Sequence, residues 1–421
     1  YIKLASLGRY TEALELIKKE NPFPAVCGRI CNKRCEDACT RGSIDDPIAI
    51  DDIKKFIAEK DLEASTRFVP KMLNQIGRPY TEKIAVIGAG PAGMSCAYYL
   101  ANKGYPVTVF EKESVPGGML TLGIPSFRLE KNVVNAEIDV LKELGVEFRF
   151  GVEVGKNMTL DALRADGYKA IYLAVGASKG TPAGCPGDDL KGVFTGVEFL
   201  RAVNLGEQPA VGKRCAVIGG GNVAMDVTRS SIRLGADKVT CVYRRRQADM
   251  TALPDEITGA LAEGAELMTL AAPVRIEADE DGAAKALWVQ PQIIGEVDKA
   301  GRPRPGKAAL EEVRIPADVI VVAIGQGVEI QGFDQAGVPI QRGAFVAGLS
   351  GQVRDMDSVF AGGDCVTGPA TAIRAIAAGK VAAANIDEHL GFRHEITVDV
   401  EIPSPKLNTS PPHGRIDTTE R

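Results

Sequence analysis

Two glycine-rich turns, each directly after an apolar strand, constrain the fold of this chain more than any other feature. The first reads GAGPAG at 88–93 and follows a strand expected over 83–87. The second reads GGGNVA at 219–224 and follows a strand expected over 214–218. A helix and a second strand come after each turn. Strands that alternate with helices predict an α/β fold with parallel sheets.

The first turn has the composition of a pyrophosphate-binding loop. Its first glycine permits the tight turn, the second lets the backbone approach a pyrophosphate, and the third lets the helix pack close to the sheet. Glu111 ends the second strand about 20 residues further on, where a carboxylate accepts ribose hydroxyls. A chance glycine turn in a surface loop is the alternative, but it leaves the strand, helix and acid unexplained. The residues assigned to this dinucleotide are Gly88, Gly90, Pro91, Ala92, Gly93 and Glu111.

FAD is the dinucleotide expected at the first turn, because flavin-side features follow it. A further glycine turn places Gly118, Met119 and Leu120 where backbone can run along the flavin. Near the C-terminal end, an apolar strand finishes in Gly363-Asp364, and the aspartate can bond a ribityl hydroxyl. A helix expected over 371–384 would direct its N-terminus at a reduced flavin. Alternatively, Asp364 is a helix cap and the Ala-rich helix serves packing. The residues assigned to that N-terminus are Ala370, Thr371 and Ala372.

The second turn differs from the first at the end of its second strand. Arg244, Arg245 and Arg246 stand where Glu111 stands in the first unit. Guanidinium groups suit a ribose 2′-phosphate, so the sequence favours NADP(H) over NAD(H), with Arg244 and Arg245 as the better candidates. A solvated basic face is the alternative. The turn itself supplies Gly219, Gly220, Gly221, Asn222 and Val223.

Two dinucleotide sites in one chain permit hydride transfer between nicotinamide and flavin. That step depends on stacking and geometry more than on an acid or a base. No catalytic side chain is therefore assigned. The three histidines, His389, His394 and His413, are expected at the surface.

Four of the nine cysteines, Cys27, Cys31, Cys35 and Cys39, recur at every fourth residue. Thiolates bunched in this way suit an iron–sulfur site. Zinc is the alternative, but zinc sites favour shorter gaps and supporting histidines. The four cysteines need not share one cluster, and can be divided between two clusters with other ligands upstream. The other five are isolated, which does not favour a redox dithiol, and four of them are expected in the core. The five isolated cysteines are Cys96, Cys185, Cys215, Cys241 and Cys365.

Composition excludes several classes of protein. The formal net charge of −5 gives no reason to expect a nucleic acid or an anionic membrane as partner. No apolar run approaches the roughly 20 residues of a membrane-spanning helix. The cysteine pattern is not that of a secreted disulfide framework, so a cytoplasmic location is expected. Because Tyr1 opens inside an expected helix, we also expect a segment upstream of it.

Taken together, these stretches resemble a known family. They are the cysteine cluster, IGAGPAGMSCAYYLANKGYPVTVFEK, GGMLTLGIPSFRLEK, AVIGGGNVAMDVTRSSIRLGA, VYRRR and FAGGDCVTGPATAIRAIAAGK. The family is that of the small, FAD-containing subunit of NADPH-dependent glutamate synthase. The N-terminal half of dihydropyrimidine dehydrogenase is similar, as is the large subunit of the flavin-bifurcating NADH-dependent ferredoxin:NADP oxidoreductase.

The resemblance implies two Rossmann-like domains, for FAD and NADP(H), preceded by a helical iron–sulfur domain with two [4Fe–4S] clusters. The expected domains are a helical one over 1–80, an FAD domain split over 81–190 and 327–392, an NADP(H) domain over 191–326 and an extended tail over 393–421. Electrons would pass to a ferredoxin or a partner subunit, in a hetero-oligomer. Further residues carried over are Lys112 and Val154 near the adenine, Arg128, Ala174 and Gly176 near the flavin, and Ala323, Ile324 and Gly325 at the second nucleotide.

Some questions stay open at the level of sequence. Some family members use a Gln or Glu as a cluster ligand, and the matching position here is Lys54, a poor ligand while protonated. A two-domain flavin monooxygenase, a free-standing small-molecule reductase and a cofactor-holding scaffold remain alternatives. The partner, the direction of electron flow and bifurcation at the flavin are also open.

Overall fold

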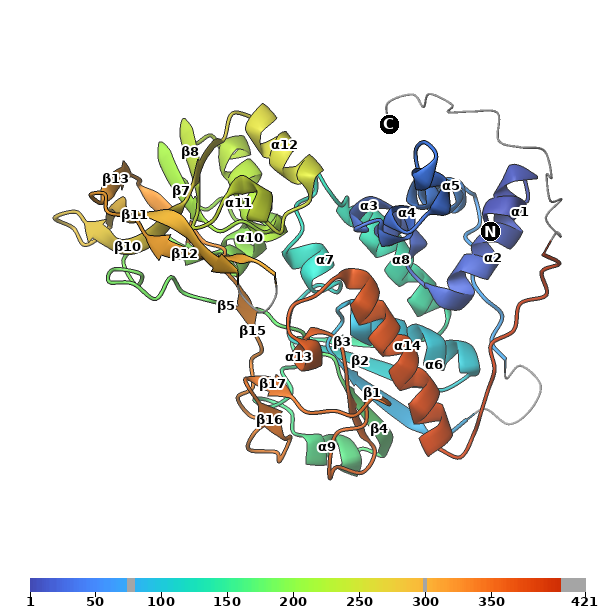
Figure 1. Cartoon of the computed structure of the whole chain (residues 1–421). Coiled ribbons are helices and arrows are strands. Elements are labelled where there is room, and N and C mark those ends of the chain that lie inside the picture. The colour runs from blue at the N-terminus through green and yellow to red at the C-terminus, as the bar shows by residue number, and fades with distance from the viewer. Residues whose placement is uncertain (74–79, 298–300, 403–421) are drawn as a thin grey trace. The chain divides into compact units, whose positions relative to one another are not determined.

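The computed structural model describes residues 1–73, 80–297 and 301–402 (Figure 1). Backbone contacts divide the chain into two compact units. The first unit comprises Tyr1–Leu120, Arg128–Gly176 and Ile330–Arg421, and the second comprises Thr121–Phe127 and Ala177–Glu329. The sequence places the start of the inserted domain at residue 191, whereas the second unit starts at Ala177. The N-terminal helices belong to the first unit.

Within the described part of residues 1–80, every regular element is helical, as expected. The second helix buries Ala13, Leu14 and Ile17, which are the apolar positions of its amphipathic pattern. They pack with Leu4 and Ile57 in a small core. The elements are α1 (Ile2–Ser6), α2 (Tyr10–Glu20), α3 (Pro24–Ile30), α4 (Arg34–Asp37), the 3-10 turn η1 (Thr40–Ser43) and α5 (Ile50–Leu62).

A five-stranded parallel sheet forms the centre of the first unit, in the order β18-β4-β1-β2-β3. Its strands are β1 (Lys83–Ile87), β2 (Val107–Glu111), β3 (Glu147–Phe150), β4 (Tyr168–Leu173) and β18 (Val359–Ala361). Helix α6 (Pro91–Lys103) lies beside α14 (Ala372–His389), which extends beyond the expected range (Figure 1). At their contact, a Cβ on Gly379 would lie 2.2 Å from the Ala92 carbonyl oxygen, so only glycine allows this approach. Four further helices belong to the unit: α7 (Met119–Leu122, which ends in the second unit), α8 (Lys131–Glu143), α9 (Leu160–Ala165) and α13 (Asp364–Thr367).

The second unit repeats this architecture. Its parallel sheet has the order β6-β14-β7-β8-β9. Its strands are β6 (Val193–Thr195), β7 (Arg214–Ile218), β8 (Lys238–Tyr243), β9 (Glu266–Thr269) and β14 (Val319–Val322). Helix α10 (Gly196–Asn204) begins at a capping box in which Thr195 and Glu198 exchange hydrogen bonds. The remaining elements are α11 (Asn222–Arg233), the 3-10 turn η2 (Gln247–Asp249) and α12 (Pro254–Ala262).

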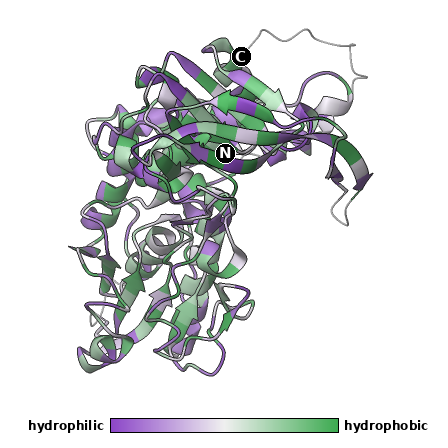
Figure 2. Ribbon diagram, turned by 90° about the vertical axis from the view of Figure 1, so that its left-hand side faces the viewer, coloured by the Kyte–Doolittle hydropathy of each residue, from purple (hydrophilic) through white to green (hydrophobic). Residues whose placement is uncertain are grey.

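The second unit also contains an antiparallel sheet that the sequence analysis does not predict. Strand β11 (Ala284–Val297) pairs with β10 (Ala271–Ala278), β12 (Pro303–Lys307) and β13 (Val313–Pro316). Ala284, Leu287 and Val289 of β11 belong to an apolar core shared with β14. Figure 2 shows the hydrophobic stretches that run along the strands. Two further strand pairs are short: β5 (Lys179–Gly180) pairs with β15 (Gln326–Gly327), and β16 (Ile340–Gln341) pairs with β17 (Ala344–Phe345).

Two further findings concern membrane-spanning helices and the C-terminal tail. No helix in the described ranges is both long and apolar enough to cross a membrane. Residues 392–402 form no helix or strand, and the rest of the expected tail, 403–421, lies outside the described residues.

Candidate FAD, nicotinamide and iron–sulfur sites

The first glycine turn lies at the carboxyl end of β1, between β2 and β4. Gly88 has a φ of +106°, and its N–H donates to the carbonyl of Phe110 at 2.7 Å. A Cβ on Gly93 would lie 1.9 Å from the Gly88 carbonyl oxygen, so the third glycine is required by close packing of α6 on the turn. The N-cap residue of α6, Gly90, has no side chain, which leaves the first amides of this helix open to an anion.

Segments from three parts of the chain, which the sequence assigns to the flavin side, converge on this turn. A Cβ on Gly88 would meet the Ala174 carbonyl oxygen at 2.5 Å, and one on Gly118 would meet the Gly90 Cα at 2.8 Å. A Cβ on Gly363 would lie 2.8 Å from the Cβ of Ala92. The structure therefore brings the turn, the 117–118 turn, the strand end at 174 and the 363–364 corner together. The glycines at these points leave a cradle lined by backbone, which side chains at the same positions would fill.

Glu111 holds the first turn from the end of β2. One carboxylate oxygen accepts the Ala89 N–H at 2.7 Å and the other accepts the Glu113 N–H at 2.9 Å. Burial raises the pKa of Glu111, although these two backbone hydrogen bonds lower it. Each oxygen keeps a lone pair, so the carboxylate can still accept hydroxyls. Val152 donates its N–H to the Glu111 carbonyl at 3.0 Å, which brings the buried Val154 segment to this strand end.

Asp364 occupies the opposite end of the cradle. Burial raises the pKa of this half-buried carboxyl, and the Ala370 N–H, which hydrogen-bonds to it, lowers it. Thr371 is the N-cap of α14 and makes no side-chain cap bond, so the first turn at Ala372 keeps open amides. Gly176 donates a backbone hydrogen bond to the neighbouring Cys365 thiol.

The other expected flavin-domain residues differ in burial. Leu120 is buried and Met119 half-buried at the start of α7, whose Leu120 carbonyl accepts Lys131 Nζ at 3.1 Å. Arg128 is half-buried and Lys112 is exposed.

The second glycine turn repeats the first in detail. Gly219 donates its N–H to the Val242 carbonyl at 3.0 Å, as Gly88 does to Phe110. A Cβ on Gly219 would lie 2.3 Å from the Ala323 carbonyl oxygen, the counterpart of Ala174. Asn222, the first residue of α11, accepts the Leu253 N–H at 2.9 Å. The structure thus brings the 219–221 turn and the 323–325 loop together, with Ile324 exposed and the half-buried Val223 on α11.

The three arginines after β8 have different environments. Arg244 is exposed. Arg245 is only 8% exposed, and its Nε donates to the Pro303 carbonyl of β12 at 3.0 Å. Arg246 forms a two-point ion pair with Asp249, at 2.9 and 2.8 Å. Arg244 is therefore the residue best placed to meet a phosphate from solvent.

Two of the clustered cysteines line a small cavity in the first unit. Cys27, Ile30, Cys31 and Asn32 form one side, and residues 371–373 at the start of α14 form the other. Burial raises the pKa of Cys27 to about 12. Two thiols thus share one cavity with the start of α14, which the sequence assigns to the flavin side.

Cys35 and Cys39 follow on α4 and at the N-cap of η1. The backbone N–H groups of Ile48, Arg41 and Gly42 hydrogen-bond to Cys39 and lower its pKa. Such bonds favour a thiolate, the form that binds iron. Within the described ranges, no group of three or more His, Cys, Asp or Glu side chains is arranged to hold a metal ion. Lys54, at the position of the expected Gln or Glu, is ion-paired with Asp51.

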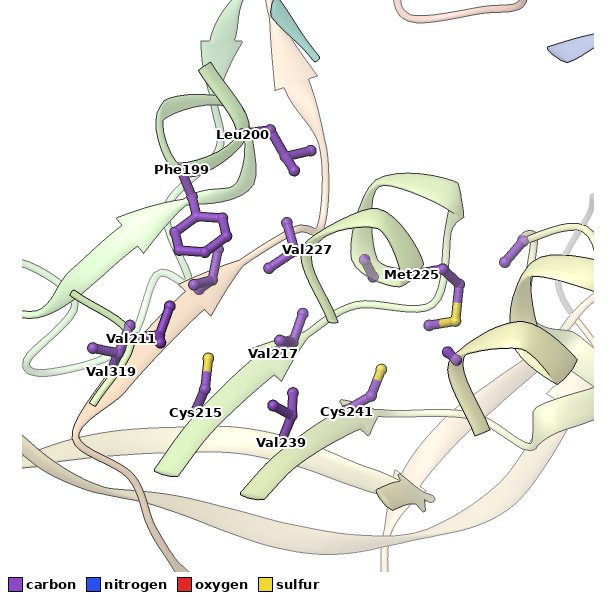
Figure 3. Packing of buried hydrophobic residues seen from close by; sticks show 14 of the residues in the cluster. Phe199, Leu200, Val211, Cys215, Val217, Met225, Val227, Val239, Cys241 and Val319 are labelled. Carbon is purple, nitrogen blue, oxygen red and sulfur yellow. The ribbon is translucent and has the colours of Figure 1, made fainter. Parts of the chain in front are cut away.

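The burial of the remaining cysteines and of the described histidines agrees with expectation except at one histidine. Cys96, Cys215, Cys241 and Cys365 are buried, as expected, and Figure 3 shows Cys215 and Cys241 among apolar side chains of the second unit. The expectation that all histidines lie at the surface is wrong for His394. Its partly buried ring bonds the buried carboxylate of Asp387 at 2.6 Å, because the chain turns back after α14. His389 is exposed, and His413 lies outside the described residues.

Sequence reasoning also missed residues that shape these sites. The Tyr243 ring covers the second turn, where a Cβ on Gly220 would lie 2.5 Å from it, and its hydroxyl donates to the Asp249 carbonyl at 2.8 Å. Asn32 and Ile30 line the cavity beside Cys31. No local pattern marks these residues, because their roles depend on segments that only the fold brings together.

Comparisons with known proteins found two family profiles that match this chain. The sequence profile of the family described as pyridine nucleotide-disulphide oxidoreductase matches residues 82–379. A second profile, dihydropyrimidine dehydrogenase domain II, 4Fe-4S cluster, matches residues 1–66. Among solved structures, FprA from Mycobacterium tuberculosis has a TM-score of 0.64 at 20% identity, over 75% of this chain and 85% of that one. That likeness shows the fold.

Curated relatives are similar over nearly the whole chain. The NADP(+)-dependent formate dehydrogenase subunit beta of Moorella thermoacetica is 38% identical over 410 residues, which are 93% of this chain and 58% of the relative. The glutamate synthase [NADPH] small chain of Escherichia coli is 35% identical over 404 residues, which are 92% of this chain and 84% of the relative. The chain thus spans little more than half of the first relative and most of the second.

The fold and the family matches define the class of protein to which this chain belongs: it is an NAD(P)H-dependent flavoprotein oxidoreductase with an N-terminal 4Fe-4S domain. Within this class, the chain belongs to the family of the glutamate synthase small chain. Both relatives described above are named as subunits of larger enzymes.

Proposed function

We propose that this chain oxidises NADPH at the second glycine turn, holds FAD at the first, and delivers electrons through [4Fe–4S] clusters to a partner subunit or ferredoxin. When bound, FAD would supply the hydride acceptor for NADPH and the clusters would supply one-electron acceptors, so that the hydride is divided into two electrons and one proton, which returns to solvent. The chain contributes binding and orientation. Glu111 and Asp364 would hold the two ends of FAD, and the open amides of α6 would meet its pyrophosphate.

One observation carries the proposal: Cys27 and Cys31 line the same cavity as residues 371–373 on the flavin side. A cluster bound by these thiolates would be next to the cradle that would hold the isoalloxazine ring. The four cysteines would be divided between two clusters, which agrees with their spread over α3, α4 and η1. The hydrogen-bonded Cys39 would bind the second.

NADPH is preferred to NADH in this proposal because of Arg244. An exposed guanidinium directly after β8 can pair with a 2′-phosphate by charge-assisted hydrogen bonds. Arg245 would shape this edge while its Nε remains bonded to Pro303. The loop 323–325 would contact the nicotinamide half, as 174–176 would contact FAD.

Anaerobic titration with NADPH, and separately with NADH, tests the function. We expect NADPH to bleach the flavin and then to produce the electron paramagnetic resonance signal of reduced clusters, and NADH to be less effective. Flavin that NADPH does not bleach would contradict the proposal and favour a scaffold role. Bleaching without cluster reduction, in protein whose clusters dithionite does reduce, would contradict the proposed electron route.

Matched cysteine variants test the metal assignment. Cys31→Ser should lose iron and sulfide, because it removes a thiolate at the cavity. Cys241→Ser should keep them, because Cys241 lies in the core of the second unit. Equal iron content in both variants would contradict the assignment.

A further inference from the structure

Glu137 forms an ionic group in the interior of the first unit. It lies on α8 and is 1% exposed. One carboxylate oxygen accepts Lys18 Nζ at 3.0 Å, and both of these side chains are buried. Arg67 Nη2 approaches the same oxygen at 3.6 Å. The other oxygen accepts the backbone N–H of Ala25 at 2.9 Å.

The bond to Ala25 attaches α8 to the helix that carries Cys27. Pro24, the first residue of α3, has no N–H, so Ala25 presents the first amide of this helix. The N-cap residue, Phe23, has no side-chain acceptor for it. The carboxylate of Glu137 therefore supplies from another element the acceptor that α3 itself lacks.

This contact joins the cysteine-bearing helix to the helix that follows the segment assigned to the flavin. Helix α3 ends at Cys31, which lines the cavity with Cys27. Helix α8 begins just after Arg128, at the end of the segment assigned to the flavin, and it lies next to α3 (Figure 1). A shift at Glu137 would therefore move the cysteines relative to the FAD cradle.

We propose that Glu137 is a positioning residue that sets the separation between the Cys27–Cys31 thiolates and the flavin, and hence the rate of electron transfer between them. This inference rests on the proposed function. Stability alone does not call for a buried ion pair, because well-packed apolar residues often serve equally well. An oriented acceptor does fix where a ligand-bearing helix sits, and electron transfer slows steeply as the distance between redox centres grows.

The test compares two double variants that both remove the buried charges. Lys18→Met with Glu137→Leu also removes the acceptor for the Ala25 N–H, whereas Lys18→Met with Glu137→Gln retains an oxygen there. In rapid-mixing experiments with NADPH, we expect flavin bleaching at the wild-type rate in both. Cluster reduction, followed by freeze-quench electron paramagnetic resonance, should slow about ten-fold or more in the Leu variant and recover in the Gln variant. The cluster midpoint potential should stay unchanged.

Asp139→Asn is the matched control, since it changes an exposed carboxylate of α8 that pairs only across the surface with Lys142. It should behave as wild type. If the Leu variant yields no folded protein, Glu137→Asp withdraws the carboxylate from Ala25 and should slow cluster reduction likewise. Wild-type cluster reduction in a folded, cofactor-loaded Leu or Asp variant would overturn the inference. Failure of NADPH to reduce the clusters of the wild-type protein would instead overturn the proposed function.

Discussion

At the scale of single residues, two glycines of the first turn have different physical reasons to be glycine. Gly93 faces protein, where a Cβ would lie 1.9 Å from the Gly88 carbonyl oxygen. Gly90 faces open space, where the nearest atom to a Cβ is the Gly118 Cα at 4.0 Å. Gly93 serves packing, and Gly90 leaves room for a ligand.

Alanine at these two positions should therefore give different outcomes. Gly93→Ala should lower the free energy of unfolding by about 2 kcal/mol or more, because backbone must move. Gly90→Ala should unfold at nearly the wild-type temperature but retain little FAD after purification. Thermal unfolding and the ratio of flavin to protein absorbance check both expectations. A Gly90→Ala protein with full FAD content would contradict the placement of the pyrophosphate.

The arginines after β8 allow a similar comparison. Arg244→Gln should raise KM for NADPH about ten-fold while leaving KM for NADH unchanged, because a charged hydrogen bond contributes about 1.5–3 kcal/mol. Arg246→Gln should change neither value much, since that guanidinium is paired with Asp249. Steady-state kinetics with an artificial acceptor measure both constants. If only the Arg246 variant lost its preference for NADPH, the 2′-phosphate would bind Arg246 and the assignment to Arg244 would be wrong.

At the scale of elements, the C-terminal end of α14 is held by one buried carboxylate. Asp387 accepts Lys103 Nζ and the Tyr105 hydroxyl, each at 2.7 Å, and it bonds His394. Burial raises the pKa of Asp387, but these hydrogen bonds outweigh it, and the net pKa is lowered. This group connects α6, α14 and the returning chain.

A lowered pKa determines how this carboxylate affects stability with pH. Its contribution is complete above the unfolded-state pKa, about 3.9 for an aspartate, and is lost as pH falls through the lower folded-state pKa. Asp387→Asn should lower Tm by about 5 °C or more at neutral pH. That difference from wild type should shrink below about pH 4. Circular dichroism melts across pH measure it, with the neighbouring exposed Glu388→Gln as control. A difference that persists undiminished at low pH would contradict this account.

At the scale of the whole molecule, two units that each contain a five-stranded parallel sheet carry two different dinucleotides in our proposal. In the first, Glu111 ends β2, and in the second, Arg244 follows β8 at the equivalent place. The N-terminal helices add the thiolates to the first unit. A route for electrons from NADPH to the clusters then requires FAD in between.

A bypass experiment checks this order of electron carriers. In Gly90→Ala protein depleted of FAD, NADPH should no longer reduce the clusters, whereas dithionite should still do so because it needs no flavin. Added FAD at high concentration should restore part of the NADPH reaction. Cluster reduction by NADPH in protein without flavin would show that the clusters receive electrons by another route.

The sequence by itself determined the strand–turn–helix units, the carboxylate at the end of β2, the arginines after β8 and the helical character of the cysteine segment. These features depend on residues close together along the chain, where propensity and spacing act directly. Only the tertiary structure decided that β12 binds Arg245, that Thr121–Phe127 packs with the second unit, and that Glu137 caps the cysteine helix. Each of these contacts joins residues distant along the chain, and long-range pairing leaves no local pattern to read.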